Sequence, residues 1–369
     1  MGAGVAWQAA RLGASVVGID RYEPPHSLGS SHAETRITRL AVAEGDQYLP
    51  FVARSHDIWR EIEALTCTRL LHESGGYIVS SAGSASERWS DFTQATADVA
   101  QRHGIDYELL SAAAACAAHP QVAFADEMAI GFEPTAGVVM SDDAVRAQLQ
   151  LAADAGARVE TQCAVTAIEP VDDLVHVTTS SGEITARHVV LAAGAWLPDL
   201  VPQPVADQLT VTRQVVYWFE VDDLEAYRPE RLPFVMWIEE TIEGYCAIFP
   251  APTGAIPAVK ILGEQFADET TANDVTRTVS DDEIADFHRR LVAPRFPGVS
   301  NRCLKAEVCL YTNTSDDHFL IQSDPRSERI TIMSPCSGHG FKHSAALGEA
   351  VAQHIVHGAS TLDLSPFGL

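Results

Sequence analysis

The chain has 369 residues, a formal net charge of −25 at pH 7 and an ordinary hydrophobic content of 46%. That length is enough for two domains, or for one large domain with an ample core. The negative charge disfavours nucleic acid as a partner because phosphate would be repelled, and no apolar run is long enough to span a bilayer. No signal peptide is recognisable, so we expect a cytoplasmic protein.

The seven cysteines are scattered along the chain, and none forms a Cys-x-x-Cys pair. An odd number of cysteines without such spacing indicates neither a zinc site nor a disulfide framework. We therefore predict no metal centre, and we expect an individual cysteine to be a buried free thiol.

The first predicted unit is a helix followed by a strand that ends in an acid. Val5–Leu12 has the composition of a helix, Gly13 fits the position after its end, and Ser15–Asp20 reads as a strand. This order is typical of the back part of a dinucleotide-binding β-α-β unit, in which Asp20 accepts a hydrogen bond from a ribose hydroxyl. If Gly2 is the third glycine of Gly-x-Gly-x-x-Gly, the acid has close to the expected spacing. We thus expect the chain to begin inside this fingerprint, without its first strand.

Two arginines follow a Pro-rich stretch. Arg36 and Arg39 are expected on one side of a turn or helix within residues 30–40. They could be ordinary surface cations. Between apolar residues of an acidic chain, however, two arginines suit a carboxylate, which arginine binds through two parallel hydrogen bonds.

Strand–helix alternation at both ends, with β-rich material between, predicts the fold class. We expect helices over 48–65 and 142–155, largely helical structure over 82–118 and a single strand over 158–168. An apolar strand then runs into Gly194 and Trp196, which is typical of a buried strand that ends at a cofactor. We predict an α/β Rossmann-like nucleotide domain with a β-rich α+β second domain threaded through it. The predicted nucleotide domain comprises residues 1–72, 137–207 and 315–369, and the substrate domain comprises 73–136 and 208–314.

The most informative stretch is residues 303–344. It reads as a strand, a tight polar turn, a second strand, the Gly-rich loop Ser337–Lys342 and a helix over 345–357. Such a loop is often only a turn before a helix. Its glycines also let backbone approach a ligand, and the helix amides favour an anion, such as a reduced flavin. Lys342 works against the helix dipole, which indicates a compensating ligand anion.

Together these residues resemble the family of monomeric sarcosine oxidase and N-methyltryptophan oxidase, flavoenzymes of the D-amino-acid-oxidase type. The matching pieces span nearly the whole chain: Pro24–His26, Gly29–Arg39, Phe132–Pro134, Gly194–Trp196, Arg213–Val216, Cys309–Thr312, Asp317–Phe319 and Ser337–Lys342. The resemblance implies FAD, joined to Cys309 through a thioether, and a monomeric enzyme. It implies that an N-methyl or cyclic secondary amino acid passes a hydride to flavin N5, that the imine hydrolyses, and that O2 becomes H2O2.

The resemblance also implies roles for individual residues. Arg39 and Lys342 would hold the substrate carboxylate, Lys260 would serve oxygen activation, and Tyr311 would complete the catalytic set. The residues expected at the cofactor are Gly2, Asp20, His32, Arg36, Val165, Gly194, Trp196, Cys309, Gly338, His339, Gly340 and Lys342.

Two departures from the family's pattern fall in the substrate pocket. Ala247 stands where close relatives carry an aromatic residue, and Glu264 stands where they carry a histidine. Both changes favour a bulkier N-methyl or cyclic amino acid over sarcosine. Three alternatives stay open: a truncated non-catalytic remnant, a flavin amine dehydrogenase with another electron acceptor, and a nicotinamide dehydrogenase that uses Asp20. The Cys309 and Ser337–Lys342 elements disfavour the last.

Overall fold

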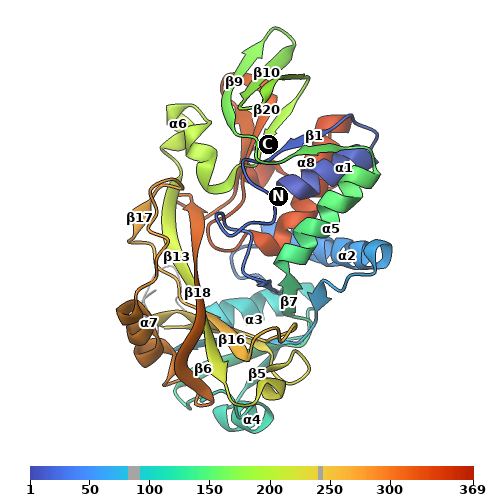
Figure 1. Cartoon of the computed structure of the whole chain (residues 1–369). Coiled ribbons are helices and arrows are strands. Elements are labelled where there is room, and N and C mark those ends of the chain that lie inside the picture. The colour runs from blue at the N-terminus through green and yellow to red at the C-terminus, as the bar shows by residue number, and fades with distance from the viewer. Residues whose placement is uncertain (82–91, 240–243) are drawn as a thin grey trace.

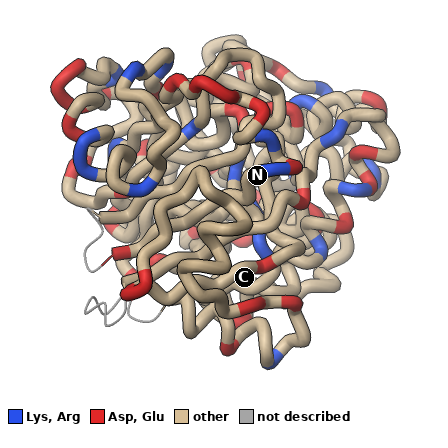
Figure 2. Tube along the Cα trace, turned by 90° about the horizontal axis from the view of Figure 1, so that it is seen from below, with Lys and Arg blue, Asp and Glu red and all other residues tan. Residues whose placement is uncertain are grey.

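The computed structural model describes residues 1–81, 92–239 and 244–369. Part of the predicted helical segment 82–118 therefore lies outside the described residues. Among those that are described, no helix is both long and apolar enough to cross a membrane. Figure 2 shows acidic residues distributed around the molecule with basic residues among them.

α1, α2, α5 and α8 gather toward one end of the molecule, which we call the helical end, and the largest sheet lies toward the other end with α3, α4 and α7 beside it (Figure 1). α1, α2, α5 and α8 pack together at the helical end. The helices are α1 Gly2–Arg11, α2 Leu49–Thr66, α3 Phe92–His103, α4 Ala112–Ala118, α5 Ser141–Asp154, α6 Gln203–Ala206, α7 Asp281–Phe287 and α8 Ser344–His357.

Glycines allow α1 and α8 to cross closely. A Cβ on Gly348 of α8 would stand 2.8 Å from the Gly4 carbonyl carbon and 2.9 Å from its Cα, both backbone atoms of α1. Gly13 has φ +87 just after α1, as expected for a helix that ends at glycine. The start of α1 is therefore held against the middle of α8.

The strands at the helical end form small separate sheets. β1 (Val17–Ile19) pairs in parallel with β8 (Arg158–Glu160), and β12 (Val189–Leu191) pairs in parallel with β20 (Ser327–Ser334). β1 and β12 belong to different sheets, and no strand among the described residues joins these two sheets. The remaining strands of this end are β9 Val165–Val171, β10 Leu174–Thr179, β11 Gly182–Ala186 and β19 Leu320–Asp324.

The prediction of one strand over 158–168 is wrong, because an irregular segment separates β8 from β9. Gln162 takes φ +53, and its backbone N–H donates to the Tyr22 carbonyl oxygen at 3.1 Å. The next amide, that of Cys163, donates to the Asp20 carbonyl at 2.9 Å. These bonds to the segment after β1 replace a continuous strand ladder.

The largest sheet contains nine strands among the described residues, with the order β17-β13-β16-β15-β14-β4-β6-β5 and β18 paired to β13. The long antiparallel β13–β18 pair sets Gln214 opposite Cys309, and its register shifts between Trp218 and Phe219. The strands are β4 Gly76–Ser81, β5 Glu108–Leu110, β6 Met128–Glu133, β13 Thr210–Val221, β14 Phe234–Ile238, β15 Cys246–Phe249, β16 Ala258–Leu262, β17 Glu269–Thr270 and β18 Val299–Asn313.

A small sheet lies between the two ends, with the order β2-β7-β3. β2 (Thr35–Thr38) and β3 (Leu71–His72) both pair with β7 (Gly137–Met140). Two large clusters of buried apolar side chains accompany this arrangement, one around α1, α2 and α8 and the other on the large sheet. The predicted fold class, a mixed α/β architecture with a β-rich second part, is confirmed. The exact domain boundaries stay a prediction.

Candidate active site

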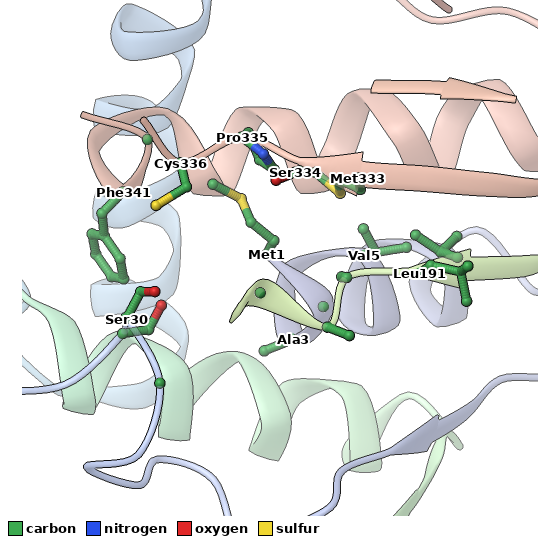
Figure 3. A pocket seen from close by; sticks show the side chains of 18 of the residues that line it. Met1, Ala3, Val5, Ser30, Leu191, Met333, Ser334, Pro335, Cys336 and Phe341 are labelled. Carbon is green, nitrogen blue, oxygen red and sulfur yellow. The ribbon is translucent and has the colours of Figure 1, made fainter. Parts of the chain in front are cut away.

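A cavity of about 1630 Å³ runs from the first turn of α1 to the strands of the large sheet. Sites for drug-sized ligands usually measure roughly 300–1,000 Å³, so this cavity has room for a larger molecule or for two. Figure 3 shows Met1 and the start of α1 beside Pro335 and Cys336, which follow β20. Most of the predicted site residues line it: Gly2, Asp20, Arg36, Arg39, Val165, Gly194, Trp196, Cys309, Tyr311, Gly338, His339, Gly340 and Lys342.

The helical end of the cavity has groups that fit a dinucleotide. Gly2 opens α1 in the cavity wall, where helix amides and the dipole favour phosphate. Asp20 follows β1, and the Tyr22 backbone N–H donates to its Oδ1 at 2.8 Å, which fixes the carboxylate there. The Ser334 hydroxyl also belongs to the wall, and it is buried without a hydrogen-bond partner among the described residues. A ligand with several polar groups would satisfy this set.

Two cations meet at one carboxylate farther along the wall. Arg39 Nη2 donates to both oxygens of Glu44 at 2.8 Å, and Lys342 Nζ donates to Glu44 Oε1 at 2.9 Å. Burial alone would raise the pKa of Glu44, but Arg39 and Lys342 hold it well below its usual value. Burial lowers the pKa of Lys342 to about 8. We call Arg39, Lys342 and Glu44 the carboxylate clamp.

Neighbouring groups fix the clamp arginine. Glu133 accepts from the backbone N–H groups of Leu40 at 2.7 Å and Ala41 at 3.1 Å, and Arg39 itself donates to the Ala41 carbonyl. The Arg39 side chain is only 2% exposed. Because its backbone and its guanidinium are both held, Arg39 presents a preformed site for a carboxylate.

Arg36 does not join the clamp, and the prediction that the two arginines share one side of a turn or helix is wrong. The β-branched sequence Thr35–Thr38 forms β2, in which Arg36 lies opposite Val139. Arg36 instead donates to the carbonyls of Thr35 at 2.8 Å and Ser30 at 2.5 Å. It therefore holds the loop before β2, although it also lines the cavity.

Cys309 lies at the end of a hydrogen-bonded chain of side chains. Its Sγ lies 3.2 Å from His32 Nε2, and His32 Nδ1 lies 3.4 Å from Glu307 Oε2. Burial opposes charge on both groups, yet their mutual hydrogen bond and Glu307 raise the pKa of His32 to about 9. Burial likewise disfavours the Cys309 thiolate, but the His32 hydrogen bond lowers the pKa of Cys309. The arrangement favours a thiolate, the reactive form of cysteine.

His32 and Lys260 lie outside the cavity wall, unlike the other predicted site residues. The buried Lys260 amino group donates to the carbonyls of Ala33 at 3.0 Å and Thr35 at 2.6 Å, and it lies 3.9 Å from the Phe249 ring centroid. Burial, followed by the charge of Arg36, lowers the pKa of Lys260 well below its usual value. Ala33 takes a left-handed backbone conformation, φ +70, in the segment that covers this lysine.

The Gly-rich loop is tied to the strand that carries Cys309. The Ser337 N–H donates to the Thr312 carbonyl at 3.0 Å, and Gly338 has φ +79. A Cβ on Gly340 would overlap the Pro335 carbonyl oxygen, so this position requires glycine. Cys309 and the loop before α8 thus face one cavity, as the sequence predicts.

Two acids at the candidate site were not predicted from the sequence. Glu44 lies in a loop after Arg39, and no sequence pattern indicates its contacts with Arg39 and Lys342. Glu307 could have been found, because residues two apart on a strand share a face, and Glu307, Cys309 and Tyr311 follow that spacing on β18.

Comparison with known proteins agrees with this geometry. The family described as FAD dependent oxidoreductase (DAO) matches residues 1–354. Monomeric sarcosine oxidase of Bacillus sp. (strain NS-129) is 32% identical over 374 aligned residues, which cover 100% of this chain and 94% of that protein. N-methyl-L-tryptophan oxidase of Yersinia pestis (strain Pestoides F) is 32% identical, over 100% of this chain and 96% of its own.

Solved structures agree at the level of the fold. NikD, an unusual amino acid oxidase, has a TM-score of 0.85 at 20% identity, covering 99% of this chain and 94% of that one. Glycine oxidase from Geobacillus kaustophilus has a TM-score of 0.77 at 17% identity, covering 100% of this chain and 95% of that one.

Proposed function

Because this chain belongs to the family of FAD-dependent oxidoreductases, we propose that it oxidises an N-methyl or cyclic secondary amino acid, with O2 as the final electron acceptor. The names of its relatives support this substrate class, since they include a sarcosine oxidase and an N-methyl-L-tryptophan oxidase. We further propose that it acts as a cytoplasmic monomer.

The observation that carries the proposal is the carboxylate clamp. Arg39 and Lys342 converge on one carboxylate in the cavity wall, at 2.8 Å and 2.9 Å. An amino acid substrate presents the same group, so its α-carboxylate would take the place of Glu44. Both cations come from buried, fixed positions, and binding the carboxylate there would orient the amine and its neighbouring C–H bonds.

The residues that would hold FAD come from separate parts of the chain. Gly2 at the start of α1 suits the pyrophosphate, and Asp20 suits a ribose hydroxyl. The Gly338–Gly340 loop and the amino end of α8 suit a group that gains negative charge. Bound there, FAD would accept a hydride from the C–H bond beside the substrate's amine nitrogen.

We propose that Cys309 is the covalent attachment point. Its thiol lines the cavity, and His32 lowers the pKa of that thiol. Lys260 supports O2 as the acceptor, since a buried amine can take up a proton when an anion forms near it and then stabilise that anion. Its carbonyl partners Ala33 and Thr35 keep that amino group fixed.

The direct test is an absorbance spectrum of the purified protein before and after acid precipitation. We expect a flavin band near 450 nm, about where oxidised flavins absorb, that stays with the protein pellet in the wild type. In Cys309→Ser the colour should move to the supernatant. Wild-type protein that releases all its flavin would refute the covalent attachment.

The substrate class is tested anaerobically on the flavin-loaded protein. N-methyl amino acids should bleach the flavin band, and admitting air should restore it with formation of H2O2. Lys260→Met should slow the recovery in air while leaving the bleaching intact. A band that no N-methyl or cyclic secondary amino acid bleaches would refute the proposed activity, and recovery only with another acceptor would exclude O2.

A further inference from the structure

Glu264 is one of the carboxylates that line the cavity outside the clamp. Glu264 follows β16, is half-buried and lines the same cavity as Arg39 and Lys342. The Tyr311 hydroxyl donates to Glu264 Oε1 at 3.0 Å. A Cβ built on Gly338 would stand 3.5 Å from the same oxygen, so the carboxylate reaches the loop that precedes α8. It therefore lies beside the loop and the strand that carry Lys342 and Cys309.

The negative charge of Glu264 acts on groups from several elements around the cavity. The pKa values of Tyr311 and Tyr245 lie far above their usual values. Burial is the largest cause of both shifts, and the charge of Glu264 is the second largest. It also opposes the lowering of the pKa of Lys342. Its influence reaches the clamp, so the two carboxylates and the two clamp cations share one electrostatic environment.

Apolar and charged groups share the cavity region that contains Glu264. Met236, Phe249 and Leu262 are among the lining residues, and Lys260 Nζ lies 3.9 Å from the Phe249 ring centroid. Charges interact more strongly beside apolar walls than in bulk water, because the local dielectric constant is lower. The negative charge of Glu264 would therefore attract a cationic group of a bound ligand.

A secondary amino acid carries two charges near neutral pH, a carboxylate and an ammonium. The clamp offers a counter-charge for the carboxylate, and Glu264 offers one for the ammonium. We propose that Glu264, positioned by Tyr311, is the ammonium subsite of the cavity and selects ligands whose nitrogen is positively charged. This inference rests on the proposed function, since the same ligand must place its carboxylate at Arg39 and Lys342.

Two isosteric carboxylates test the subsite by binding alone. Trimethylglycine carries a fixed positive charge on its nitrogen, and 3,3-dimethylbutanoate has a neutral carbon in its place. Calorimetric titration of the purified full-length protein should give at least a tenfold preference for trimethylglycine, which corresponds to about 1.4 kcal/mol. Glu264→Gln should reduce the preference to within about twofold, and Glu264→Asp should keep most of it.

Glu349→Gln is the matched control. Glu349 is also a buried carboxylate, but it is paired with Arg54 at the helical end and does not line the cavity. Its loss should leave the preference unchanged. Equal affinities in the wild type, no binding of trimethylglycine, or a preference that survives in Glu264→Gln would overturn the proposal.

Failure of the subsite and failure of the proposed function give different results. If N-methyl amino acids bleach the flavin while wild type shows no charge preference, only the subsite is wrong. If the preference depends on Glu264 but no secondary amino acid bleaches the flavin, the subsite stands and the proposed reaction is wrong.

Discussion

Replacing Glu44 by glutamine tests whether the Glu44 carboxylate occupies the position that a ligand carboxylate would take between Arg39 and Lys342. Glu44 receives contacts of 2.8, 2.8 and 2.9 Å from Arg39 and Lys342, and an incoming carboxylate has to break them. A hydrogen bond to a charged group contributes about 1.5–3 kcal/mol. Removing one such competitor should therefore tighten carboxylate binding by roughly 10- to 150-fold.

The same substitution should weaken the fold. Breaking a buried ion pair by removing one partner costs roughly 3–5 kcal/mol, because the remaining charges lose their compensation. Glu44→Gln should accordingly unfold at lower urea concentration than the wild type while binding carboxylates more tightly. If Glu44 competes with an incoming carboxylate for Arg39 and Lys342, the variant should gain affinity although it loses stability. Simple damage to the site would lower both the affinity and the stability.

The assay is a calorimetric titration with methoxyacetate, a carboxylate that has an ether oxygen in place of an amine. The titration is run at about pH 6.5 so that Lys342 stays protonated in both proteins. Glu44 raises the pKa of Lys342, so this pKa should be lower in Glu44→Gln than in the wild type. Glu349→Gln serves as the control, because it also removes a buried carboxylate paired with arginine. Unchanged affinity in Glu44→Gln, or an equal gain in Glu349→Gln, would refute the reasoning.

Three further predictions follow from other parts of the structure. The affinity of the wild type for methoxyacetate should fall as the pH rises through about 8, because burial lowers the pKa of Lys342 to that value and the amine is neutral above it. In the same calorimetric titration, Lys342→Met should remove this dependence on pH. His32→Gln should decrease the covalently bound share of flavin several-fold, measured as colour in the acid pellet, because the Cys309 thiolate loses its stabilising neighbour; a wild-type share would contradict this. Gly348→Ala should cost roughly 1–3 kcal/mol in urea unfolding because its Cβ would meet the Gly4 backbone, whereas Gly18→Ala, whose nearest neighbour is 3.8 Å away, should cost less.

The sequence predicts local elements and strongly patterned segments well. Helix α8, the Gly-rich loop and the strand of Cys309 follow from hydrophobic period, glycine positions and turn residues within one stretch of chain. These three elements are also neighbours in sequence, so their common cavity could be predicted.

The parts of the site that depend on distant contacts could not be predicted. Glu44 reads as a surface acid, and only tertiary packing brings it to Lys342, 298 positions away. Arg36 and Arg39 read as a pair, but strand pairing with β7 sends the first to backbone carbonyls. The burial of Lys260 likewise depends on a distant contact, because the loop at Ala33 covers its amino group.

The irregularity in the β13–β18 pair separates two parts of the long strand β18. Regular pairing runs from Lys305 opposite Trp218 to Asn313 opposite Thr210, and the register shifts beyond Trp218. A residue inserted before Leu304 can be absorbed at this bulge, so Cys309 keeps its partner Gln214. An insertion between Lys305 and Cys309 would instead turn the thiol to the opposite face of the sheet, away from its histidine. The protein should therefore tolerate length changes at the far end of β18, whereas a single extra residue between Lys305 and Cys309 should turn the Cys309 thiol away from His32.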